Sequence, residues 1–170
     1  MYPYGICNFN IIARENYAFV DKTDFIAKLE KERYVSFLRP RRFGKSLWLS
    51  VLEHYYDVNQ KNNFQLLFGK YYIGQNKTKL ANSYRILKFD FSGITSEFSN
   101  PREGFNYSVQ SSFERFWECN PDVFDKEKEI KISNIENGED KVKIFFQRYP
   151  KDIPIYLLID EYDHFTNDIL

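Results

Sequence analysis

The sequence predicts an α/β fold in which helices flank a parallel sheet. Two apolar runs, residues 34–38 and 155–159, have the aliphatic and aromatic character of strands buried on both faces. The first run leads through a short polar loop into a helical pattern, and the second ends in the carboxylates Asp160 and Glu161. A buried strand followed by a helix is the unit from which parallel sheets are built.

Composition narrows the class of protein. The chain has 170 residues, enough for a domain with a substantial core. Lys plus Arg and Asp plus Glu number 24 each, and this neutral balance argues against a generic nucleic-acid-binding surface, which would be basic. Cys7 and Cys119 offer no disulfide framework or metal spacing. No leader or membrane-length apolar run is evident, so we expect a cytoplasmic protein without membrane contact.

The loop after the first run carries Gly44, Lys45 and Ser46. The phosphate-binding signature G-x-x-x-x-G-K-[ST] is matched at its last three positions, and Arg39 stands where the first glycine belongs. Gly44 would bring the backbone close to a phosphate, and the following helix would direct its free N–H groups at the anion. Lys45 would reach the β- and γ-phosphates, and the Ser46 hydroxyl would bind Mg²⁺. The alternative is an ordinary strand, turn and helix with an exposed lysine.

The helix that begins near Lys45 has two adjacent apolar rows, which predict a wide buried face: Leu47, Val51 and Tyr55, with Trp48, Leu52 and Tyr56. Upstream, Asp21 or Thr23 is a plausible N-cap for a short helix that bears three apolar side chains, Phe25, Ile26 and Leu29. That helix either packs beside the first strand or lines an adenine pocket.

Further elements follow from the same patterns. We predict a short helix over residues 64–68, a strand over 84–91, a helix over 101–120 and the end of a helix over 142–149. The stretch 122–143 is dense in charges of both signs and predicts a solvated helix or loop.

Asp160 and Glu161 supply the second half of the predicted site. Both would lie at the carboxyl end of a parallel strand, where open α/β sheets bind ligands. Asp160 would hold Mg²⁺ and its water shell, and Glu161 would act as the general base toward the attacking water. Taken alone, the pair is equally compatible with a strand that ends in solvated acids. Together with Gly44, Lys45 and Ser46, it predicts a P-loop NTPase-type sheet that binds ATP and Mg²⁺.

Three stretches resemble one family, the AAA-ATPase-like domain proteins of bacteria and archaea. They are N-Y-A-F-V-D-K-T at 16–23, R-P-R-R-F-G-K-S-L at 39–47 and L-I-D-E-Y-D at 158–163. The family's phosphate loop reads R-P-R-R-F-G-K-[ST], so Arg39 follows the family's own pattern. Asp163 also matches, without an assigned role. The resemblance implies that Ser46 and Asp160 are metal ligands, that Glu161 is catalytic, and that ATP binds at seven residues: Arg41, Arg42, Phe43, Gly44, Lys45, Ser46 and Leu47.

The resemblance also bears on completeness. In such ATPases, the strands that flank the phosphate-loop strand, a sensor residue and arginine fingers follow the Asp-Glu strand, whereas this sequence ends at Leu170. We therefore expect residues 1–170 to be the N-terminal portion of the domain: a fragment, a truncated gene product, or a chain completed by a partner. Such a chain should be poorly stable and inactive as a hydrolase. Many members carry a PD-(D/E)XK nuclease-like domain further on, and its presence here stays open, as does the oligomeric state.

Three functions compete at this point. The first is part of an ATPase or ATP-driven switch, and the second is a nucleotide-binding module without turnover. The third is a nucleic-acid-binding module that uses Arg39, Arg41 and Arg42, whose binding would depend strongly on salt. If the ATPase prediction holds, the strands 35–38 and 155–159 should be parallel in one sheet. The side chains of Asp160 and Ser46 should then lie within several ångströms of each other, close enough to share Mg²⁺ and its water shell.

Overall fold

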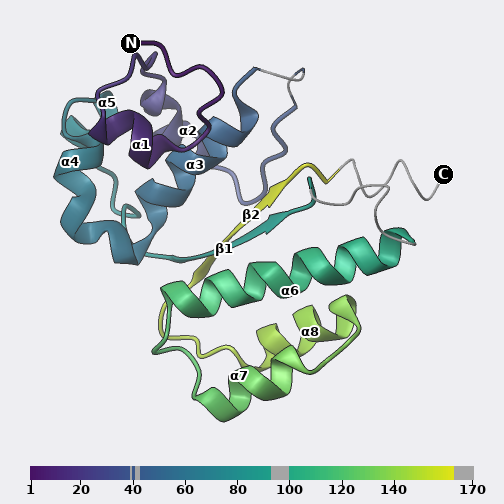
Figure 1. Ribbon diagram of the computed structural model, residues 1–170. Coiled ribbons are helices and arrows are strands. Elements are labelled where there is room, and N and C mark those ends of the chain that lie inside the picture. The colour runs from purple at the N-terminus through teal and green to yellow at the C-terminus, as the bar shows by residue number, and fades with distance from the viewer. Residues whose placement is uncertain (39, 41–42, 93–99, 163–170) are drawn as a thin grey trace. The chain divides into compact units, whose positions relative to one another are not determined.

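The computed structural model describes residues 1–38, 40, 43–92 and 100–162 (Figure 1). The chain divides into two compact units, Met1–Tyr84 and Arg85–Leu170. In the part of the chain described, no helix is long and apolar enough to cross a membrane.

The N-terminal unit is helical and has an aromatic core. Phe9, Tyr55 and Phe68 are fully buried, and the ring centroid of Phe68 lies 5.0 Å from that of Phe9 and 5.4 Å from that of Tyr55. Packing of these rings therefore joins α1, α3 and α4. The elements in order are α1 (Phe9–Arg14), the 3₁₀ turn η1 (Thr23–Phe25), α2 (Ile26–Leu29), α3 (Lys45–Tyr56), the 3₁₀ segment η2 (Val58–Asn63), α4 (Phe64–Phe68) and α5 (Tyr72–Gln75).

Helix α3 confirms the helix predicted after the phosphate loop. The C-terminal halves of its two apolar rows are buried at Val51, Leu52, Tyr55 and Tyr56. The N-terminal members, Leu47 and Trp48, are only partly buried. The helix thus joins the core at one end and leaves an apolar surface near its N-terminus.

The strand predicted over residues 34–38 is wrong for this structure. These residues are described, and none of them belongs to a strand. Tyr34 is 86% exposed and Leu38 is 77% exposed, although both were expected to be buried. An extended segment becomes a strand only when a neighbour accepts and donates its ladder hydrogen bonds, and no described strand lies against this one. Residues 35–38 and 155–159 belong to different units, so the expectation that they share a sheet stays a prediction.

The C-terminal unit contains a parallel strand pair. Strand β1 (Arg85–Asp90) runs parallel to β2 (Ile155–Asp160), in a register that places Arg85 opposite Ile155 and Asp90 opposite Asp160. Helix α6 (Pro101–Cys119) packs on β1, and α8 (Gly138–Arg148) packs on α6 (Figure 1). Phe113 of α6 joins these layers, because its ring centroid lies 5.9 Å from Phe89 and 4.5 Å from Phe145. The predicted α/β class, with a parallel sheet and flanking helices, is thereby confirmed.

The charge-rich stretch 122–143 adopts the helical alternative of its prediction, but it is not solvated throughout. It forms α7 (Lys126–Ser133) and the first half of α8, and it buries Glu129 and Lys141. Lys141 Nζ donates hydrogen bonds to the Ser133 carbonyl oxygen, 3.1 Å away, and to Gln110 Oε1. Burial lowers the pKa of Lys141 from its ordinary value. The prediction of a solvated segment is wrong at these two positions, because hydrogen bonds compensate for their lost hydration.

Candidate functional site

Gly44 has the backbone geometry that the phosphate-loop prediction requires. It is the N-cap of α3 with φ +76°, a left-handed conformation that favours glycine. Its carbonyl oxygen accepts the first helical hydrogen bond, from Trp48 N at 2.9 Å. Lys45 and Ser46 follow in the first turn and are half-buried. The N-terminus of this twelve-residue helix, with N–H groups that lack intrahelical partners, is a favourable place for an anion.

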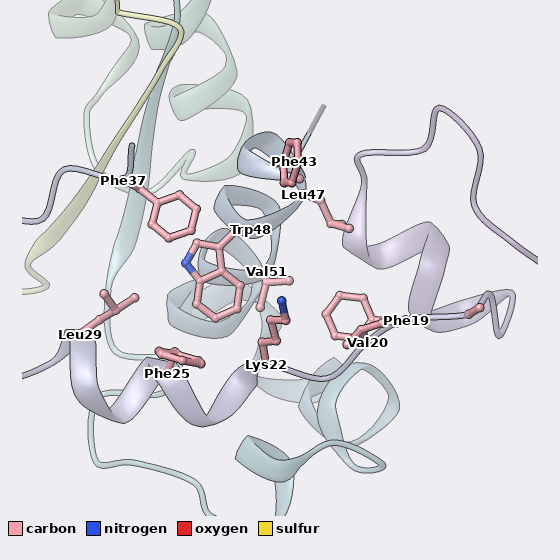
Figure 2. Close-up of a pocket in the computed structure, with 12 residues that line it drawn as sticks. Phe19, Val20, Lys22, Phe25, Leu29, Phe37, Phe43, Leu47, Trp48 and Val51 are labelled. Carbon is pink, nitrogen blue, oxygen red and sulfur yellow. The ribbon is translucent and has the colours of Figure 1, made fainter. Parts of the chain in front are cut away.

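A cavity of about 360 Å³ adjoins this helix end (Figure 2). Its walls are almost entirely apolar and come from three parts of the N-terminal unit. Residues 18–29 contribute Ala18, Phe19, Val20, Lys22, Phe25 and Leu29, and Phe37 comes from the extended segment. The loop and α3 contribute Phe43, Gly44, Leu47, Trp48 and Val51. The volume falls at the lower end of the range for small-molecule pockets.

The short helix upstream of the loop contributes two side chains to the cavity lining. Phe25 and Leu29 line the cavity, as an adenine-pocket wall would, whereas Ile26 is fully buried in the core. Phe25 and Leu29 are four residues apart and therefore lie on the same face of the helix, whereas Ile26 lies on a different face, which packs into the core.

A hydrogen-bonded clamp holds the segment that contains Lys22. Asp21 Oδ1 accepts hydrogen bonds from Thr23 N at 2.9 Å and Thr23 Oγ1 at 2.7 Å, and Asp21 Oδ2 accepts one from Tyr72 N at 2.7 Å. Thr23 is fully buried, and its Oγ1 accepts from Ile73 N at 3.1 Å. Burial opposes ionisation of Asp21, but its hydrogen bonds outweigh that effect and hold the pKa of the carboxyl below its ordinary value. Residues 21–23 are thereby fixed against α5.

The far end of α2 is tied to α3 through Glu30. Its Oε1 accepts hydrogen bonds from Tyr56 OH at 3.2 Å and from Thr78 Oγ1 at 2.7 Å. Thr78 N in turn donates to Tyr55 OH at 3.0 Å. The cavity wall formed by α2 is therefore anchored at both ends.

Asp160 and Glu161 lie at the carboxyl end of β2, as the sequence predicts. Asp160 is 6% exposed, and its Oδ1 accepts a hydrogen bond from Glu161 N at 3.1 Å. Glu161 has φ +52°, a conformation that costs a non-glycine residue about 1–3 kcal/mol and that clusters at functional sites. The left-handed backbone at Glu161 therefore follows directly on the end of strand β2.

Gly44, Phe43 and Leu47 are brought together with Phe25 and Leu29 around the cavity. Ser46 and Asp160 belong to different units, so their proximity stays a prediction. Four other arginine and aspartate positions of the prediction, Arg39, Arg41, Arg42 and Asp163, lie outside the described residues.

Comparison with known proteins indicates the family to which the chain belongs. The profile of a family described as predicted AAA-ATPase matches residues 3–170. The chain belongs to this family. Comparisons with curated proteins and with solved structures gave no significant match. Membership of this family of predicted AAA-ATPases confirms the resemblance to the AAA-ATPase-like proteins and supports an ATPase-like, nucleotide-binding function.

The sequence patterns did not single out several residues that line the cavity. The apolar periodicity predicts that Trp48 lies on a buried helix face, and it does not indicate a cavity there. Lys22 stands between the two N-cap candidates, Asp21 and Thr23, and no pattern in the sequence marks it as a cavity residue. The sequence signal for Lys22 is its place inside the 16–23 motif, which by itself does not distinguish it from a solvated lysine. Among the described residues, no group of three His, Cys, Asp or Glu side chains is placed to hold a metal ion.

Proposed function

We propose that the chain binds ATP in the cavity of its N-terminal unit, with the base against the aromatic walls and the phosphates at the start of α3. The observation that carries this proposal is the continuity of the cavity lining with Phe43 and Gly44 at the helix N-terminus. A flat aromatic base suits walls built from Phe25 and Trp48, and a phosphate suits the N-terminus of a helix. A nucleotide contains both an aromatic base and phosphates, so a single ligand can occupy the aromatic cavity and the helix N-terminus.

Each predicted residue then has a role. Lys45 neutralises phosphate charge, and the backbone at Gly44 allows the close approach. Ser46 and Asp160 supply a hydroxyl and a carboxylate, hard oxygen donors of the kind that Mg²⁺ binds. When bound, Mg²⁺ would neutralise charge on the phosphates. Glu161 accepts the proton of the water that attacks the terminal phosphate.

The proposal is tested first through binding. Lys45→Ala should weaken Mg·ATP binding by about 10- to 100-fold or more, because a charged donor to the phosphates is lost. Lys31→Ala is the matched control, since Lys31 is exposed and does not line the cavity. Isothermal titration calorimetry of the chain and both variants gives the affinities. Equal affinity in the chain and the Lys45 variant would refute the phosphate site.

Turnover tests the catalytic role separately. In a longer protein that carries the rest of the domain, Glu161→Gln should bind ATP with nearly unchanged affinity and hydrolyse it more slowly, because an amide cannot accept the proton from water. Hydrolysis at the parent rate would show that Glu161 is not the base. ATP binding by the unchanged chain without any turnover would favour a nucleotide-binding module over an ATPase.

A further inference from the structure

Lys22 is the one ionisable residue in the described lining of an otherwise apolar cavity. Figure 2 shows its side chain pointing from the residue 18–25 wall toward α3, in the direction of Val51, which also lines the cavity. We infer that Lys22 is a specificity-determining residue, which donates a hydrogen bond from Nζ to a ring nitrogen of the bound purine. This inference rests on the proposed ATP site.

The position of Lys22 is built into the fold. The residues on either side of it are held by hydrogen bonds, through Asp21 to Tyr72 N and through Thr23 to Ile73 N. Its stem therefore starts from a fixed point of the backbone. The nearby Lys28 differs, because its Nζ pairs with Asp24 Oδ2 at 3.3 Å. Lys22 has no such carboxylate partner among the described residues, so its donors are available to a ligand.

The geometry of α3 separates this lysine from the phosphate end. Val51 follows Lys45 by six residues, which corresponds to about 9 Å along the helix axis at a rise of roughly 1.5 Å per residue. Phosphates at the helix N-terminus would therefore lie well away from the Val51 end of the cavity, toward which Lys22 points. The part of the nucleotide within reach of Lys22 is the base.

The ammonium group of Lys22 determines which kind of ligand atom it can bind. Lysine has three donors and no acceptor, so it requires an acceptor on the ligand. The ring nitrogens of a purine are acceptors, whereas the exocyclic amino group of adenine is a donor. A charge-assisted hydrogen bond in an apolar pocket contributes more than a neutral one, and an analogue without the acceptor would leave the ammonium unpaired there.

The test combines one variant with altered ligands. Lys22→Met keeps the length of the stem and removes the donors. It should weaken ATP and ADP binding by the same factor, about 10- to 100-fold, because the γ-phosphate is not involved. Of three ATP analogues in which N1, N3 or N7 is replaced by carbon, one should bind the unchanged chain more weakly by a similar factor. That analogue and ATP should bind the Lys22→Met variant equally. Lys31→Met serves as the control, and calorimetry measures all affinities.

The outcomes separate the two proposals. If the unchanged chain binds neither ATP nor ADP, the proposed function fails. If it binds ATP but Lys22→Met binds equally well, the role of Lys22 is refuted while the site stands. The analogue measurements on the unchanged chain do not depend on how the variant folds. If all three analogues bind that chain as tightly as ATP does, the hydrogen bond to a ring nitrogen is excluded.

Discussion

At the scale of single residues, Gly44 shows how a local conformation serves a site. Its φ of +76° lies in the left-handed region, and a Cβ built on it would meet no atom within 4 Å. Substitution there would therefore cost conformational energy without a steric clash. The phosphate-binding signature predicted a special backbone role for this residue, because the glycine before Lys-Ser lets the backbone approach a phosphate. The role of Lys22 was not predictable in the same way, since one lysine in a sequence cannot be told from a solvated one.

Gly44→Ala should destabilise the N-terminal unit by about 1–2 kcal/mol, the cost of a left-handed alanine. It should also weaken ATP binding, because relief of the strain would move the backbone at the start of α3. The matched control is Gly5→Ala, since Gly5 has φ +74° and equally open surroundings but does not line the cavity. Thermal unfolding and calorimetry of both variants would compare the two effects. The same change in affinity for both variants would contradict a local role of Gly44 in ligand binding.

At the scale of elements, local patterns predicted helices better than strands. Helices α3 and α6 were found from their own apolar periodicity, which needs no information about distant residues. Residues 34–38 have the composition of a buried strand, but strand formation depends on a neighbour that composition cannot specify. Glu129 and Lys141 were likewise unpredictable, because their burial depends on how α7 and α8 pack.

The clamp between residues 21–23 and α5 gives a prediction with a defined pH dependence. Asp21→Asn should lower the free energy of unfolding at neutral pH by about 1 kcal/mol, a small value because the carboxylate is exposed to screening solvent. The pKa of Asp21 is lower in the folded chain than its ordinary value of 3.8, so the ionised form favours folding. This contribution is present above pH 3.8 and is lost as the pH falls below that value through the folded pKa.

Denaturant unfolding of the chain and of Asp21→Asn at several pH values measures this contribution. The difference between them should be constant near neutral pH and should shrink below pH 3.8. Asp24→Asn is the control, because Asp24 makes only an exposed ion pair with Lys28 and such pairs contribute little. A difference for Asp21→Asn that does not change with pH would show that the ionised carboxylate is not what stabilises the clamp.

At the scale of the whole molecule, the residues predicted to bind ATP and Mg²⁺ are distributed over both compact units. Lys45, Ser46 and the cavity belong to the N-terminal unit, whereas Asp160 and Glu161 belong to the C-terminal unit. The C-terminal unit has its own core around Phe113 and Phe145. We therefore expect two unfolding transitions without ligand, one for each unit. Phe145→Ala should reduce the free energy of unfolding of the C-terminal unit by about 3–5 kcal/mol and leave the transition of the N-terminal unit unchanged. This variant assigns the transitions to the units.

Removal of the metal then tests whether the two units act on one ligand. A ligand stabilises whatever it binds in the folded state, by about 2.7 kcal/mol at a concentration one hundred times its dissociation constant. ATP with a chelator should raise only the transition of the N-terminal unit, because the base and phosphates bind there. Mg·ATP should raise both transitions, since Mg²⁺ held by Ser46 and Asp160 would link the units. Asp160→Asn should abolish the additional effect of Mg²⁺ on the C-terminal transition and retain the effect of ATP on the other. If Mg·ATP raises the C-terminal transition of this variant as much as that of the unchanged chain, Asp160 is not a metal ligand. The phosphate loop and the Asp160–Glu161 pair would then not act on the same nucleotide.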